Sequence, residues 1–82
     1  MTSDITMYGV TWCGDCHRAR RFFDNYGINY TFIDIDQDSE AEAFVLAANN
    51  GNRSVPTIIF PDGSKLVEPS TRVLADVTGV AL

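Results

Sequence analysis

Apolar residues recur at helical spacing in three segments of the chain. The clearest segment begins at Cys13 or Gly14 and ends at Tyr26, where Gly27 supplies a stop signal. Its apolar residues lie three or four positions apart and therefore form one stripe along a helix. These residues are Cys16, Ala19, Phe22, Phe23 and Tyr26. The pattern predicts an amphipathic helix that packs this stripe against a core.

Two later helices are predicted from their start signals. Residues 39–49 open with a capping box, in which the Ser39 hydroxyl and the Glu42 carboxylate bind backbone N–H groups. The inward residues of this helix are Ala41, Phe44, Val45 and Ala48. Ser70 predicts the N-cap of a last helix, which ends at Gly79. Its inward residues are Val73, Leu74 and Val77.

Runs of β-branched and aromatic residues predict four strands. They cover residues 4–8, 28–34, 57–60 and 64–67. The second run has apolar residues at both alternating positions, so we expect that strand to be mostly buried on both faces. Asp62 and Gly63 form a hairpin signal between the last two runs. A helix separates the first two strands, which should therefore be parallel with a right-handed crossover.

The elements follow one another as β-α-β-α-β-β-α, without repeats, linkers or low-complexity segments. We therefore expect residues 1–82 to form a single α/β domain, in which three helices flank a mixed four-stranded sheet. With 45% hydrophobic residues, a chain of 82 residues can bury a core for one small domain. This arrangement is the smallest form of the thioredoxin-like architecture.

The net charge of −5 arises from eleven acidic and six basic residues, and it argues against a nucleic-acid partner. The chain has no apolar run of about 18 residues and no signal-peptide pattern at its start. We therefore expect a cytoplasmic protein without a membrane partner, and we expect it to act as a monomer. Arg18, Arg20 and Arg21 gather on the first helix, either as a solvated face or as a surface that attracts an anionic partner.

The only two cysteines, Cys13 and Cys16, form a C-x-x-C motif between the first strand and the first helix. This placement is the sequence form of a thioredoxin-like redox site. The free N–H groups and the dipole at the helix start favour the thiolate of Cys13, which is the nucleophilic form. Cys16 falls on the apolar stripe and should be shielded. We expect a redox-active pair in which Cys13 attacks a disulfide and Cys16 resolves the product.

Two structural interpretations of the cysteines compete with the redox one. A structural zinc ion needs four protein ligands, and the chain offers Cys13, Cys16 and a single histidine, His17. A structural disulfide across so short a loop would constrain little of the chain. Both are disfavoured, so no metal ligand is predicted. His17 is either a surface residue or a group that shares a proton with Cys13.

Two motifs carry a resemblance to a known family. The first is Trp12-Cys13-Gly14-Asp15-Cys16, and the second is Arg53-Ser54-Val55-Pro56-Thr57 before the third strand. Together they resemble the glutaredoxins over nearly the whole chain, and most specifically the mycoredoxins, which use mycothiol instead of glutathione. The resemblance implies a thiol–disulfide oxidoreductase that reduces mixed disulfides between proteins and a low-molecular-weight thiol. It implies no bound cofactor, because mycothiol or glutathione is a co-substrate that an NADPH-dependent reductase keeps reduced.

The resemblance also implies binding residues around the cysteines. Val55 and Pro56 should be joined by a cis peptide, which leaves their backbone groups able to pair with a substrate. Arg53 should steer a substrate carboxylate. Trp12 should form a partly exposed apolar wall that shields Cys13.

Three positions depart from the pattern of the glutaredoxins. Residues 68–71 replace a glycine pair, and here Ser70 and Thr71 should bound the far end of the substrate with N–H groups and hydroxyls. Thr11 replaces a lysine that often precedes the cysteine pair. Asp15 replaces an aromatic residue, and its carboxylate either opposes the helix effect on Cys13 or is simply a favourable charge at a helix start.

Three other functions are left open. The chain could reduce protein disulfides with electrons from thioredoxin reductase. It could carry a [2Fe–2S] cluster between two subunits, each giving one cysteine, with the small thiol completing the ligands. As a pure interaction domain, it would have an inert Cys13.

Overall fold

The computed structural model describes residues 5–82. Its elements are β1 (Ile5–Gly9), α1 (Gly14–Asn25), β2 (Tyr30–Asp34), α2 (Ser39–Ala48), β3 (Thr57–Ile59), β4 (Lys65–Val67) and α3 (Thr71–Thr78). The predicted order of strands and helices is confirmed. The predicted start of the first strand at position 4 lies outside the described residues.

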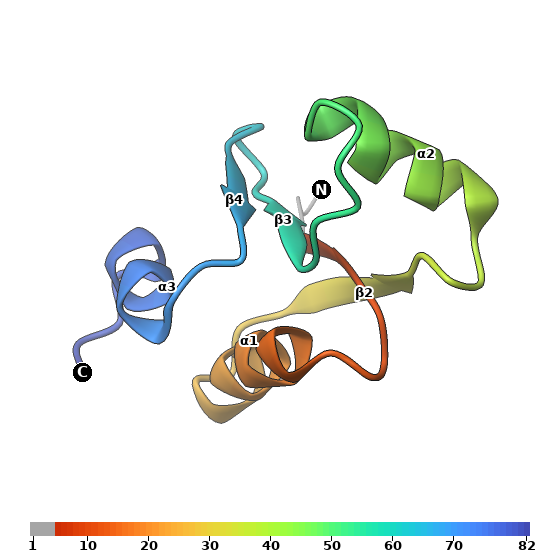
Figure 1. The fold of residues 1–82 in the computed structure, drawn as a ribbon. Helices are drawn as coiled ribbons and strands as arrows, with labels where there is room; N and C mark the ends of the chain where they lie inside the picture. The colour runs from red at the N-terminus through yellow and green to blue at the C-terminus, as the bar shows by residue number, and fades with distance from the viewer. Residues whose placement is uncertain (1–4) are drawn as a thin grey trace.

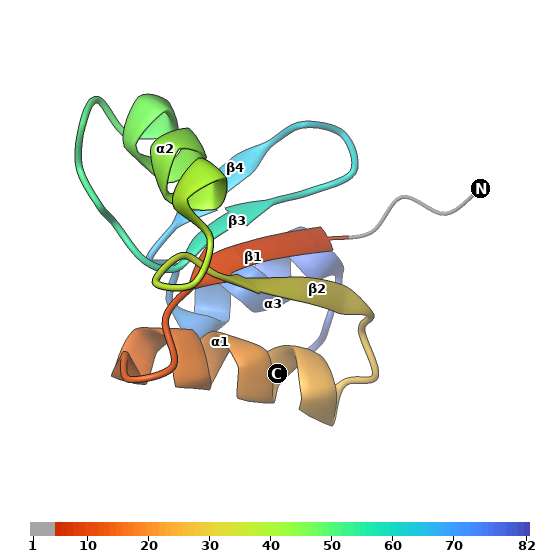
Figure 2. The same cartoon turned by 90° about the vertical axis from the view of Figure 1, so that its right-hand side faces the viewer.

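The four strands form one mixed sheet in the order β2-β1-β3-β4 (Figure 1). β1 and β2 are parallel, as the helix between them requires, and β3 is antiparallel to both β1 and β4. Figure 2 shows α1 and α3 on one face of the sheet and α2 on the other. The predicted α/β architecture, with three helices around a four-stranded sheet, is therefore confirmed.

A separate apolar cluster fills each side of the sheet. The larger one lies between the sheet and the helices α1 and α3, and it contains the fully buried Phe23 and Leu74. The smaller one lies under α2 and consists of Val10, Ile35, Ala41 and Val45. Met7 belongs to the larger cluster and Val10 to the smaller one, so β1 and the start of the following loop are held from both faces.

The second helix starts differently from the prediction. Its N-cap is Asp38, whose carboxylate accepts a hydrogen bond of 3.0 Å from the N–H group of Ala41. The predicted capping box at Ser39 is therefore wrong by one residue, because aspartate caps a helix as well as serine does. The carboxylate of Glu42, which the capping box would use, pairs with Arg53 instead.

Four apolar side chains that the sequence pattern placed inward are exposed: Tyr26, Phe44, Val73 and Val77. These predictions are wrong because each helix buries only a narrow stripe. In α3 that stripe is Leu74 and Ala75, so the two valines lie on its flanks. No helix within residues 5–82 has both the length and the apolar character needed to cross a lipid bilayer.

β2 lies at the edge of the sheet, so the prediction that it is mostly buried on both faces is wrong. Thr31 is exposed, and the other residues of β2 are half-buried. Tyr30 and Phe32 still pack against the larger apolar cluster, and Ile33 packs against the smaller one. The apolar pattern of this strand therefore arises from contacts on both faces, whereas its exposure arises from its position at the edge.

Candidate active site

The loop after β1 places Cys13 immediately before α1. Cys13 is the N-cap residue, with an extended backbone (φ −99°, ψ 126°), and its carbonyl accepts a hydrogen bond of 3.1 Å from the N–H group of His17. Its side chain is half-buried, and its sulfur lies 4.0 Å from the carbonyl oxygen of Val55. The Cys13 sulfur therefore lies between the positive end of a helix and the segment that leads into β3.

Cys16 lies about one helical turn further along α1 and is fully buried. Burial raises the pKa of the Cys16 thiol from 9.0 to about 12; a hydrogen bond with the backbone of Val10 opposes this rise, and the neighbouring Cys13 adds to it. Cys16 is therefore a protonated thiol at neutral pH. The structure thus combines a partly exposed cysteine with a fully buried one, in the order that the sequence predicted.

Val55–Pro56 is a cis peptide, as the resemblance implied. Pro56 is buried, and its carbonyl accepts a hydrogen bond of 2.9 Å from the N–H group of Glu68, just after β4. At the other end of this segment, the Thr57 hydroxyl donates a hydrogen bond of 2.7 Å to the Ser54 carbonyl. The backbone that faces the Cys13 sulfur is thus held on both sides.

Hydrogen bonds also connect this segment to α2. Asn49, the C-cap residue of α2, donates from its side-chain amide to the Val45 carbonyl and to the Thr57 hydroxyl, both at 3.0 Å. Thr57 is fully buried. The sequence indicated only a helix stop at Asn49, because its contact with Thr57 forms only in the folded chain. Asn49 is therefore a site-supporting residue that sequence reasoning missed.

Trp12 is 70% exposed and is anchored by its indole N–H group, which donates a hydrogen bond of 2.8 Å to the carboxylate of Asp36. Asp36 follows β2, and its own N–H group donates to the Asp34 side chain at 2.9 Å. The hydrogen bonds from Trp12 and Arg53 hold the pKa of Asp36 below its usual 3.8. Trp12 therefore presents an exposed ring at a fixed place beside Cys13.

Arg53 is held by two protein carboxylates. Its guanidinium pairs with Glu42 at 2.6 Å and with Asp36. These contacts raise the pKa of Arg53. Arg53 is thus close to the predicted site, but the structure places two carboxylates of this chain on the group that was expected to meet a carboxylate of the substrate.

Ser70 caps α3, as predicted, because its hydroxyl oxygen accepts a hydrogen bond of 3.2 Å from the N–H group of Val73. Thr71, the first residue of α3, lines a depression on the flank of α1 together with Arg18 and Arg21. The structure therefore places these two residues at the junction of α1 and α3. The hydroxyl of Ser70 is already engaged in the cap.

Two polar neighbours of the cysteines also have protein partners. Asp15 pairs with Arg18 at 3.0 Å, so the charge of the carboxylate between the cysteines is partly balanced. His17 is exposed, and its ring nitrogen Nε2 lies 2.5 Å from the carbonyl oxygen of Thr11. This contact ties the loop before Cys13 to the first turn of α1. It favours the interpretation of His17 as a surface residue.

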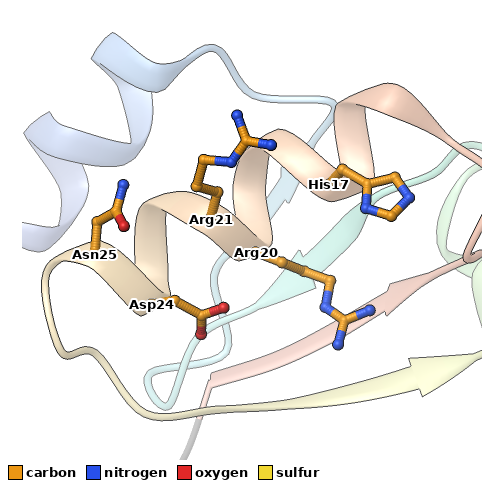
Figure 3. Close-up of a pocket in the computed structure, with 5 residues that line it drawn as sticks. All are labelled: His17, Arg20, Arg21, Asp24 and Asn25. Atoms are coloured by element: carbon orange, nitrogen blue, oxygen red, sulfur yellow. The ribbon is translucent and has the colours of Figure 1, made fainter.

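The arginines of α1 point in different directions. Figure 3 shows the side chains of Arg20 and Arg21 diverging from the helix. Arg20 covers β2: its Nε donates to the Tyr30 hydroxyl at 3.3 Å, and its guanidinium carbon lies 4.1 Å from the centre of the Phe32 ring. Arg20 is therefore engaged with β2, and it also lines one pocket together with Arg21 and His17.

Known proteins are similar to this chain in both sequence and fold. The Glutaredoxin family model matches residues 5–65. The chain is 41% identical over 70 residues to a Mycobacterium tuberculosis protein named as a glutaredoxin. The matched residues make up 85% of this chain and 83% of that protein. It is 38% identical over 80 residues to Mycoredoxin 1 of Corynebacterium glutamicum, and the matched residues make up 96% of this chain and 99% of that protein.

The fold is similar to the crystal structure of the glutaredoxin (grx-1) from Archaeoglobus fulgidus. The TM-score is 0.75 at 22% sequence identity, and the match covers 94% of this chain and 87% of that one. The sequence matches, the fold and the paired cysteines at the start of α1 thus all indicate the same family. The chain belongs to the glutaredoxin family of thiol–disulfide oxidoreductases.

Proposed function

We propose that this chain reduces mixed disulfides between proteins and a low-molecular-weight thiol, and that this thiol is mycothiol. The observation that carries the proposal is the contrast within the C-x-x-C pair. Cys13 is partly exposed at the start of α1, whereas Cys16 is fully buried. The similarity to Mycoredoxin 1 over 96% of the chain supports mycothiol rather than glutathione.

In the first step, the Cys13 thiolate attacks the small-thiol sulfur of the mixed disulfide. A disulfide bond forms between Cys13 and the small thiol, and the target protein leaves as a thiolate that takes up a proton. A second small thiol, as its thiolate, then attacks this adduct. It releases the Cys13 thiolate together with the symmetrical disulfide of the small thiol. The mixed disulfide and one free small thiol thus become the free thiol of the target protein and the symmetrical disulfide of the small thiol.

Cys16 can also release the small thiol from the adduct, because its sulfur can attack the sulfur of Cys13 and form the Cys13–Cys16 disulfide. The attacking species is a thiolate, and burial, which is the largest cause of the raised pKa of Cys16, disfavours ionisation of its thiol at neutral pH. We therefore expect release by an external thiol to be the main route. Cys16 acts as the resolving cysteine when that thiol is scarce.

The residues around Cys13 bind the small thiol in this proposal. Trp12 supplies an aromatic wall, and the backbone of residues 55–56 presents polar groups opposite the sulfur. Residues 70–71 bound the far end at the start of α3, where backbone N–H groups are available. Arg53 lies beside Trp12, joined to it through a shared carboxylate.

The proposal needs no bound cofactor, because the small thiol supplies the electrons. An NADPH-dependent reductase returns that thiol to its reduced form. The protein partners are targets that carry mixed disulfides. We propose that the chain acts as a cytoplasmic monomer.

NADPH-coupled turnover of the Cys16→Ala variant tests the proposal. Mycothiol and glutathione mixed disulfides are assayed side by side, each with its own reductase. Activity retained with mycothiol alone is the expected result. Activity with glutathione alone would identify a glutaredoxin with an altered pocket. No activity with either, together with insulin reduction by the wild type and thioredoxin reductase, would contradict the proposal and support the protein-disulfide reductase alternative.

A further inference from the structure

Polar contacts link the two segments that border Cys13. Trp12, which precedes it, donates to Asp36, and Asp36 pairs with Arg53. Arg53 lies two positions before Val55, whose carbonyl oxygen is 4.0 Å from the Cys13 sulfur. Figure 2 shows the loop after β1, the start of α2 and the segment before β3 at the same end of the sheet. Arg53 is therefore part of the surface that surrounds the reactive sulfur.

Negative charges exceed the positive charge of Arg53 at this surface. Its guanidinium pairs with both Asp36 and Glu42, so the three side chains together carry a net charge of −1. The charge beside the cysteine loop is therefore negative even though Arg53 is present.

An anionic ligand that approaches Arg53 comes close to two carboxylates that are already paired with it. The Nε group of the guanidinium already donates to Glu42, and an Nη2 group donates to Asp36. Both carboxylates would repel an anionic ligand at the other N–H groups of Arg53, because like charges brought together disfavour binding. A ligand without a carboxylate meets no such repulsion.

We propose that Asp36 and Glu42 are specificity-determining residues, which direct the site towards low-molecular-weight thiols that carry no carboxylate. The inference rests on the proposed function and names the class of its small thiol. Glutathione is a tripeptide with a carboxylate at each end. Mycothiol is an acetylated cysteine joined to an amino sugar and inositol, and it has no carboxylate. The paired Arg53 therefore discriminates against glutathione.

Thiol–disulfide exchange at Cys13 tests this inference without turnover of a protein target. On a Cys16→Ala background, Cys13 is the sole thiol. The protein is equilibrated with equal concentrations of glutathione and mycothiol, each in reduced and oxidised form. Intact-mass spectrometry then gives the ratio of the two Cys13 adducts. D36N and E42Q each remove one negative charge with little change of shape, and the amide oxygen of D36N can still accept the Trp12 hydrogen bond.

We expect D36N and E42Q each to raise the ratio of glutathione adduct to mycothiol adduct by about 1.5- to 5-fold, the scale of an exposed ion pair. E40Q is the matched control, because it removes the same charge from the first turn of α2. Within residues 5–82, Glu40 is not an ion-pair partner of Arg53. E40Q should leave the ratio unchanged.

Unchanged ratios in D36N and E42Q, or an equal rise in E40Q, would overturn the inference while leaving the proposed function intact. A Cys16→Ala protein that forms neither adduct would overturn the proposed function, and this inference would fall with it. The two failures are therefore distinguishable in one experiment.

Discussion

The sulfur of Cys16 lies directly against the backbone of Gly9, at the end of β1. A Cβ atom added to Gly9 would lie only 2.8 Å from that sulfur and 3.1 Å from a ring carbon of Phe32. Both contacts are shorter than packed atoms normally tolerate. The absence of a side chain at position 9 therefore lets α1 bring Cys16 close against the sheet.

Gly9→Ala should consequently destabilise the reduced protein by about 1–3 kcal/mol, the usual cost of overpacking a core. The measurement is urea-induced unfolding under reducing conditions. Gly14→Ala is the matched control, because an added Cβ there meets no atom within 4 Å. It should leave the free energy of unfolding unchanged or slightly raised. Equal stability of Gly9→Ala and the wild type would contradict this account of the packing around Cys16.

The raised pKa of Cys16 predicts how stability depends on pH. The native thiol keeps its proton up to about pH 12, whereas an unfolded cysteine loses it near pH 9.0. Between these two values the native state binds more protons, so the free energy of unfolding should fall as the pH rises. Below pH 9 the contribution of Cys16 is fully present. Cys16→Ala should remove this part of the decline, as unfolding curves at pH 8 to 10 would reveal.

The same burial predicts selective alkylation of the native protein. Iodoacetamide at neutral pH should modify Cys13 and leave Cys16 unmodified, because Cys16 is both buried and protonated. Peptide mass spectrometry identifies the modified residue, and protein unfolded in urea should react at both positions. Equal labelling of the two cysteines in the native protein would contradict the assignment of Cys16 as the shielded sulfur.

The hydrogen bonds of the Thr57 hydroxyl should stabilise the segment opposite Cys13. Thr57→Val leaves the Ser54 carbonyl and one N–H group of Asn49 without this partner, at a cost of about 1–3 kcal/mol. It should also lower the rate of mixed-disulfide reduction, because Val55 follows Ser54 directly. Thr57→Ser keeps the hydroxyl and should keep most of the activity. A Thr57→Val protein with full activity would show that these hydrogen bonds do not position the site.

The parts of the fold that depend on near neighbours could be predicted from the sequence. The stripe from Cys16 to Phe23 and the cap at Ser70 each require residues only a few positions apart. The position of Cys16 on that stripe also predicted its burial. The exposure of Val73 could not be predicted in this way, because both flanks of a short amphipathic helix carry apolar residues and only the packing decides which is covered.

The contacts around the candidate site were harder to predict, because they join distant segments. The Trp12 indole and the Asp36 carboxylate are 24 positions apart, and Arg53 and Glu42 are 11 apart. The sequence shows that these charges exist but not which of them meet. Arg53 was therefore predicted as a residue free to meet a substrate carboxylate, and the structure shows it paired twice.

The most direct test of the account is to trap the attacking sulfur. Cys13→Ser and Cys16→Ser variants are incubated with the symmetrical disulfide of mycothiol, and the adduct is measured by intact-mass spectrometry. The account predicts one mycothiol on Cys13 in the Cys16→Ser protein and none in the Cys13→Ser protein, whose remaining sulfur is buried and protonated. An adduct on Cys16 at a similar rate, or no adduct on Cys13, would contradict the claim that Cys13 is the nucleophile.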